Sequence, residues 1–90
     1  MQFELGRVVA TPGALRALEE NAVDVWGLLQ RHVNGDSGCV PEEDKLENIR
    51  CIDKGGRVMS SYPLNDRSDV LWIITESDRS STCLLLPDEY

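Results

Sequence analysis

Three apolar runs of strand length fill the C-terminal part of the chain, and they constrain the fold more than any other feature. They are "RVMSSYPL" (57–64), "VLWIIT" (70–75) and "TCLLLP" (82–87). The polar segments between them are rich in Asp and Ser, which is typical of turns between strands. Consecutive strands joined by short turns predict an antiparallel meander. The middle run is apolar at both parities, which predicts a central strand.

The N-terminal part of the chain predicts one strand followed by three helices. The strand is expected at 3–10, at or beside a sheet edge, and the helices at about 12–20, 21–34 and 41–54. Thr11 followed by Pro12 is a typical helix start, and Asn34 followed by Gly35 is a typical stop. Helical spacing predicts these core-facing residues: Leu15 and Leu18; Ala22, Val25, Trp26, Leu29 and Val33; Leu46, Ile49 and Ile52.

The order strand, three helices, three strands predicts a single α+β domain over residues 1–90. The apolar faces of the helices must be buried, and the apolar face of the meander is the only large surface available to them. We therefore expect a three- to four-stranded antiparallel sheet with about three helices packed on one face.

The charge of the chain is strongly acidic, with a net value of −7. Residues 1–34 contain four acids and three bases, whereas 35–56 and 57–90 each contain six acids and three bases. Such a field repels phosphate backbones and attracts basic surfaces. We expect no direct nucleic-acid binding and a protein partner with a basic surface. The simpler interpretation is that the charge keeps a small domain soluble.

Three cysteines, Cys39, Cys51 and Cys83, argue against a closed disulfide framework because their number is odd. The chain has neither a basic start followed by a long apolar run nor a stretch near the ~20 apolar residues of a membrane span. We expect a cytoplasmic protein, monomeric or homodimeric, without membrane contact. The cysteine spacing lacks a C-x-x-C pair, so neither a metal site nor another cofactor is expected.

His32, the only histidine, is the one side chain that suggests catalysis. Together with Arg79 and Thr82 it resembles the layout of small metal-independent ribonuclease toxins, which use a proton acceptor, a cation and a hydroxyl group. The plainer interpretation places His32 at a helix C-terminus. It likewise explains the segment 76–82 as a turn whose Asp and Ser side chains bond the backbone.

Several phrases of the sequence resemble a family of small "plasmid-related" proteins found on plasmids, integrated elements and prophages. They are "LGRVVATPGALRALEE", "LLQRHVNGDSG" followed by "EEDKLENIR", and "LWIITESDRSSTCLLLPDEY". The resemblance extends from about Leu5 to Tyr90. Ser37 stands where the family usually has an aromatic residue. The resemblance implies a bacterial mobile element as the context but no particular biochemical activity.

Charge and context together favour a non-enzymatic inhibitor of a host defence or nucleic-acid-handling protein, similar in role to anti-CRISPR or anti-restriction proteins. It would occupy a basic surface and so compete with nucleic acid. The expected partner-binding residues are Asp36, Glu42, Glu43, Asp44 and Glu47. The ribonuclease-like toxin with His32, Arg79 and Thr82 is the alternative, and an accessory subunit of the element's own machinery is a third possibility.

Overall fold

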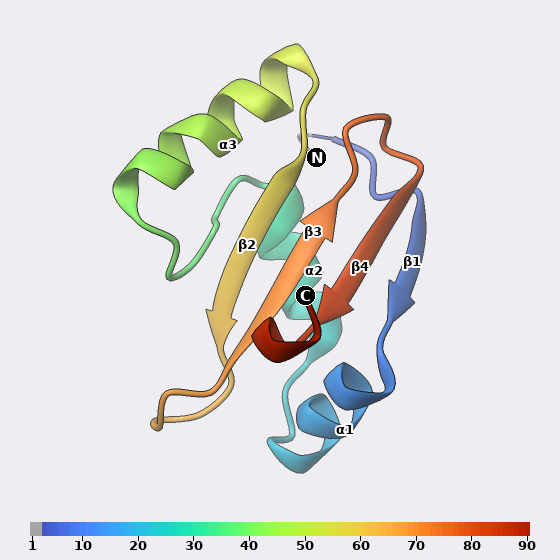
Figure 1. Cartoon of the computed structure of the whole chain (residues 1–90), viewed down its shortest axis with the longest axis vertical. Coiled ribbons are helices and arrows are strands. Elements are labelled where there is room, and N and C mark those ends of the chain that lie inside the picture. Colours follow the sequence, from blue (N-terminus) through green and yellow to red (C-terminus); the bar gives the residue numbers. More distant parts are fainter. Residues whose placement is uncertain (1–2) are drawn as a thin grey trace.

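Four strands form one mixed sheet in the order β1-β4-β3-β2 (Figure 1). The structure is a computed structural model that describes residues 3–90. The strands are β1 (Arg7–Ala10), β2 (Val58–Pro63), β3 (Val70–Thr75) and β4 (Ser81–Leu85). The three C-terminal strands pair antiparallel, as the meander prediction required. The class is therefore α+β.

The pairing of β1 corrects the prediction of a fully antiparallel sheet. β1 lies at the edge and runs parallel to β4, with Arg7 opposite Ser81 and Ala10 opposite Leu84. A short turn forces antiparallel pairing within the meander. The long helical connection after β1 instead allows either direction, because parallel neighbours need a crossover of a dozen or more residues. Sequence pattern alone could not decide between the two.

Three α-helices and a short 3₁₀ helix complete the part of the chain that the structure describes. They are α1 (Pro12–Glu20), α2 (Val25–Val33), α3 (Glu42–Lys54) and η1 (Pro87–Glu89). Thr11 caps α1 by accepting a hydrogen bond from the Ala14 amide, as the sequence indicated. Asp24 caps α2 by accepting a hydrogen bond from the Trp26 amide. No helix within residues 3–90 is both long and apolar enough to cross a membrane.

The main core lies between one face of the sheet and the helices α1 and α2; Figure 1 shows α2 behind the strands. Leu18, Leu29 and Val33 are buried as predicted. Leu15 and Trp26 are not, since 59% and 69% of their respective surfaces remain exposed. The main cluster consists of Ala14, Leu18, Leu28, Leu29, Tyr62, Leu64, Leu71, Ile73 and Leu84.

Helix α3 runs beside β2 instead of covering the sheet. Of its expected apolar stripe, Ile52 packs against the core, but Leu46 and Ile49 do not. Leu46 is 64% and Ile49 57% exposed, and Asn48 is the only buried residue of the helix. Asn48 Nδ2 donates to Met59 O at 2.5 Å, and the Met59 amide donates to Asn48 Oδ1 at 3.1 Å. The edge of a sheet presents backbone polar groups, so the helix that covers it turns a carboxamide toward it.

The loop before α3 closes the rest of this edge. The Cys39 amide donates to Ser61 O at 2.7 Å, and the Ser61 amide donates to Ser37 O at 3.0 Å. Ser37 is buried and its hydroxyl accepts a hydrogen bond from Asn48 at 2.8 Å. The outer edge of β2 is thus occupied by a loop and a side chain.

Candidate functional site

A chain of hydrogen-bonded, buried polar side chains links β2, β3 and β4 through His32 of α2. His32 is fully buried; its Nδ1 lies 2.6 Å from Ser60 Oγ and its Nε2 lies 2.9 Å from Thr75 Oγ1. Thr75 Oγ1 lies 2.7 Å from Thr82 Oγ1, which donates to the carbonyl oxygen of Leu5 at 2.7 Å. We call Ser60, His32, Thr75 and Thr82 the buried polar chain.

The direction of its hydrogen bonds defines one protonation state of the ring. The Leu5 carbonyl can only accept, so Thr82 donates to it and accepts from Thr75. The Thr75 oxygen then accepts a hydrogen bond from His32 Nε2–H. Nδ1 is left to accept one from Ser60. The neutral Nε2–H tautomer satisfies every member of the chain.

The electrostatics of His32 agree with a neutral ring. Burial and the nearby positive charge of Arg79 lower the pKa of His32 from 6.5 to about 4. The ring of Phe3 packs edge-on against the imidazole, with a centroid distance of 5.3 Å. At neutral pH the ring is an uncharged, solvent-free structural group.

Arg79 is a cross-link between the last hairpin and the end of α3. Its Nη2 donates to Cys51 O at 2.7 Å, and its Nη1 donates to Gly56 O and to Glu76 O. The guanidinium also lies over the Phe3 ring, 5.3 Å from its centroid. These contacts hold the turn, the C-terminus of α3 and the N-terminal segment together.

The structure thus brings His32, Arg79 and Thr82 into one region, but it encloses two of them. His32 and Thr82 have no exposed surface, and their polar atoms are hydrogen-bonded inside the protein. A general base has to lie within hydrogen-bond reach of its substrate. In this conformation no phosphate can reach the imidazole, and the ribonuclease-like alternative stays a prediction.

The segment 76–82 has the geometry of a hairpin turn. The Arg79 amide donates to Glu76 O at 2.9 Å, and the Ser80 amide donates to Asp78 Oδ1 at 3.0 Å. The Glu76 carboxylate pairs with Arg57 at 3.4 Å rather than with Arg79. The Asp78 carboxylate therefore has the structural role that turn chemistry predicts.

The five expected partner-binding acids lie on the surface around α3. Asp36 accepts a 2.7 Å hydrogen bond from Arg31, which lowers the pKa of Asp36 below its usual range. On α3, Glu42 lies 3.9 Å from Lys45 and Glu47 lies 3.6 Å from Arg50. Glu43 and Asp44 form no ion pair within residues 3–90.

The exposed side of α3 combines these acids with two aliphatic side chains. Residues three, four and seven positions apart share a helix face, so Glu42, Leu46, Ile49 and Asp53 form one continuous stripe. Glu43 and Glu47 lie next to it. We call this surface, consisting of Glu42, Glu43, Leu46, Glu47, Ile49 and Asp53, the α3 ridge. It has an apolar centre and a charged border in which Lys45, Arg50 and Lys54 lie 3.6–3.9 Å from three of the carboxylates. Sequence reasoning placed its apolar half in the core.

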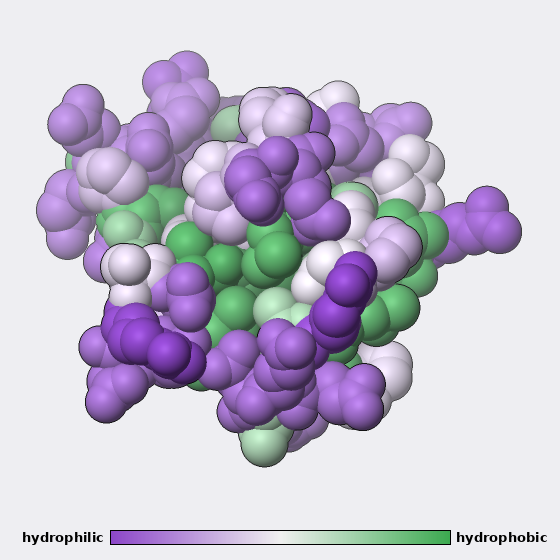
Figure 2. Space-filling view, turned by 60° about the horizontal axis from the view of Figure 1, so that its bottom comes forward, coloured by the Kyte–Doolittle hydropathy of each residue, from purple (hydrophilic) through white to green (hydrophobic). Residues whose placement is uncertain are grey.

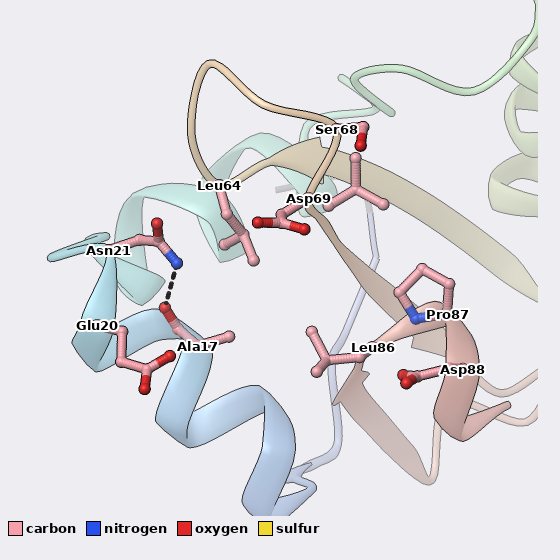
Figure 3. Close-up of a pocket in the computed structure, with 10 residues that line it drawn as sticks. Ala17, Glu20, Asn21, Leu64, Ser68, Asp69, Leu86, Pro87 and Asp88 are labelled. Carbon is pink, nitrogen blue, oxygen red and sulfur yellow. Dashed lines mark hydrogen bonds between the residues drawn. The ribbon is translucent and has the colours of Figure 1, made fainter.

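A pocket of about 390 Å³ opens between the end of α1, the β2–β3 turn and η1 (Figure 3). Its floor is partly apolar and its walls include the carboxylates of Glu20, Asp69 and Asp88. Within the described part of the chain, no three His, Cys, Asp or Glu side chains come together in a way that could hold a metal ion.

Comparisons with models of protein families, with curated proteins and with solved structures find no match for this chain. The resemblance to plasmid-related proteins accordingly stays a hypothesis.

Sequence reasoning did not identify Ser60 and Asn48 as buried polar residues, although the position of each in the sequence gave some indication of it. Ser60 shares the buried parity of β2 with Val58 and Tyr62, and a polar residue at such a position requires a buried partner. Asn48 is the other, an amide between two aliphatic residues of an acidic helix. Its role in hydrogen bonding could be inferred only once α3 is known to lie along a sheet edge.

Proposed function

We propose that the protein is a small acidic binding protein of a bacterial mobile element that inhibits a host defence or nucleic-acid-handling protein by occupying a basic surface on it. The observation that carries this proposal is the α3 ridge. Helix α3 contributes one buried residue to the fold and turns two aliphatic side chains outward among carboxylates.

The composition of the ridge supports a role in binding. Protein interfaces typically have an apolar centre surrounded by a polar rim, and an amphipathic helix docks its apolar residues into a groove. Leu46 and Ile49 are one helical turn apart and would enter the same groove. Their exposure does not help the domain itself, because neither residue packs on its core.

The charge of the ridge indicates the chemistry of the groove. Glu42, Glu43, Glu47 and Asp53 border the aliphatic pair. Three of these carboxylates lie beside a base of the same helix at the exposed surface. Helix α3 still contains five acids against three bases, and the whole chain carries −7. Carboxylates arranged in this way complement Lys and Arg side chains, which also bind phosphate backbones. A partner that fits the ridge is therefore a basic nucleic-acid-binding protein with an apolar groove, and binding would exclude its nucleic acid.

A non-enzymatic mechanism agrees with the interior of the protein. The buried polar chain is fully hydrogen-bonded, and no buried side-chain nitrogen or oxygen within residues 3–90 lacks a partner. A group whose hydrogen bonds are all satisfied inside the core stabilises the fold and needs no substrate to explain it. Steric and electrostatic exclusion then accounts for the activity without a reacting group.

The test is affinity capture from host lysate with the wild type and with the double variant Glu43→Lys/Glu47→Lys. The matched control is Glu19→Lys/Glu20→Lys on α1, which changes the net charge equally at two exposed positions. We expect the wild type and the control to retain the same basic protein. The α3 variant should lose it by about tenfold or more, since its new Lys side chains face the basic groove and like charges repel.

Two further readouts distinguish inhibition from charge-driven adhesion. Added nucleic acid should displace the captured protein, and Leu46→Ala/Ile49→Ala should weaken capture without any change in charge. Equal capture by the α3 charge-reversal variant and the control would disprove the proposal. So would a captured protein that binds its nucleic acid and the wild type simultaneously.

A further inference from the structure

The two edges of the sheet are treated differently. At β2 the outer edge is closed by Asn48 and by the loop around Ser37 and Cys39. At β1 no segment within residues 3–90 covers the other edge in this way, and Figure 1 shows β1 at the outer margin of the fold. Natural sheets usually protect their free edges with charged residues, prolines, bulges or covering loops. The contrast singles out β1 as an edge that is available for pairing.

The outward backbone groups of β1 belong to Val8 and Ala10. Arg7 and Thr11 donate their amides to Ser80 O and Leu84 O of the β4 side, both at 3.0 Å. Alternate residues of a strand direct their N–H and C=O groups to opposite sides, so those of Val8 and Ala10 point away from β4. Within the described chain, neither amide forms a hydrogen bond outside the sheet ladder.

Apolar side chains surround this open edge. Val8 and Val9 are each 41% exposed. A groove of about 300 Å³ lies between β1 and the helices α1 and α2, and Leu15 and Trp26 form part of its wall. Figure 2 shows apolar surface, in green, on this end of the molecule, reaching the right-hand side where β1 lies in Figure 1. The edge therefore offers both backbone pairing and apolar burial.

The distribution of charge favours a second copy of the chain as the occupant. Residues 1–34, which include β1, α1 and α2, contain four acids and three bases, a net charge of −1. Residues 35–90 contain twelve acids and six bases, a net charge of −6. Glu89 of the second group lies beside the end of β1, where its carboxylate accepts a hydrogen bond from Thr11 at 2.6 Å. Even with this acid, two copies of so acidic a chain repel each other least when they approach through the side formed by residues 1–34.

We propose that two copies pair through β1 in an antiparallel arrangement about a two-fold axis, forming one continuous eight-stranded sheet. Val8 lies opposite the partner's Ala10, and each such pair exchanges both of its N–H···O bonds. Val9 lies on the axis opposite the partner's Val9. Pairing one step earlier would involve Gly6, whose φ of +65° is not extended, and pairing one step later would involve Pro12, which has no amide.

The oligomeric state tests this proposal without reference to any host partner. Sedimentation equilibrium of the wild type should give twice the 10.1 kDa mass of the chain. Val9→Lys places two charges on the axis and should give the monomer mass. Leu46→Lys adds the same charge on the opposite side of the sheet and should stay dimeric. A monomeric wild type, or a dimer that Val9→Lys leaves intact, overturns the proposal.

Disulfide trapping tests the register. In a chain with Cys39, Cys51 and Cys83 replaced by Ala, Val9→Cys should form a covalent dimer on mild oxidation. Directly opposed residues in antiparallel strands have Cβ atoms about 4.5–5.5 Å apart, which small adjustments bring within disulfide range. Leu46→Cys in the same background should stay uncrosslinked. Failure of the Val9→Cys chain to cross-link faster than this control overturns the register.

Discussion

Asn48 bonds both backbone groups of Met59, so a single side chain of α3 takes the place of a neighbouring strand at the edge of β2. This relationship explains how a helix with little apolar contact stays attached to the sheet. The attachment thus combines hydrogen bonds to the sheet edge with the packing of Ile52 on the cluster of Phe3, Val33 and Val58.

Replacing Asn48 by Ala should destabilise the protein by about 1–3 kcal/mol, because it leaves backbone groups at the sheet edge without their partners. Urea unfolding measures the change. Gln30→Ala, at an exposed position of α2, is the matched control and should change stability by less than about 0.5 kcal/mol. Equal stability of the two variants would show that α3 is held by other contacts.

Truncating an isoleucine on the inner side of α3 should lower the stability of the protein much more than truncating one on its outer side. Ile52 packs against the cluster of Phe3, Val33 and Val58, so Ile52→Ala should cost about 1–3 kcal/mol. Ile49→Ala should change stability by less than about 0.5 kcal/mol, because Ile49 is already in water. Thermal unfolding of both variants checks this, and a larger loss for Ile49→Ala would contradict the orientation of α3.

The protein should lose stability as the pH falls from about 6.5 toward 4. The pKa of His32 is about 4 in the folded protein and 6.5 in the unfolded chain, so the unfolded state takes up a proton first. The contribution of neutral His32 to the free energy of unfolding is fully present above pH 6.5. Roughly 3 kcal/mol of it is lost by the pH at which the ring titrates in the folded protein. Urea unfolding at pH 7 and 4.5 measures it.

Two observations would separate His32 from the carboxylates in that experiment. Asp36, Asp78 and Glu89 have lowered pKa values, so their contributions are lost only at still lower pH. His32→Gln has no titrating ring and should show a much flatter profile between pH 7 and 4.5. An unchanged slope in this variant would place the pH dependence elsewhere.

Arg79→Ala should loosen the end of α3 and change the titration of His32 at the same time. The substitution removes the hydrogen bonds to Cys51 O and Gly56 O, at a cost of about 1–3 kcal/mol. It also removes a positive charge that lowers the pKa of His32, so that pKa should rise toward 6.5. Hydrogen exchange over residues 50–56 and NMR titration of the imidazole measure the two effects. Arg67→Ala, in the exposed β2–β3 turn, should change neither.

Local patterns were sufficient to predict most of the elements. The apolar runs at β2, β3 and β4, and the capping by Thr11, follow from residue chemistry within a few positions, and the structure has them. The direction of β1 did not follow, because it depends on a partner near the other end of the chain. The orientation of α3 did not follow either, since an apolar stripe predicts burial only where a face exists to receive it.

The candidate site residues also divide into those that local sequence predicts and those that depend on distant parts of the chain. Acidic residues on α3 were predictable from composition and spacing, and they lie on the surface. Their role in binding stays a prediction. The burial of His32 was not predictable, because its partners Ser60 and Thr75 are supplied by separate strands. Side chains that depend on distant partners are those for which sequence periodicity carries the least information.

The hydrogen bond between Thr82 and the Leu5 carbonyl joins positions 77 residues apart, and β1 has no strand to pair with until β4 exists. During synthesis, α1, α2 and β1 therefore leave the ribosome long before the sheet that covers them. Until the sheet forms, the buried faces of α1 and α2 are exposed to solvent in addition to Leu15 and Trp26. High contact order of this kind slows folding, so the nascent N-terminal third should depend on chaperone protection more than the finished domain does.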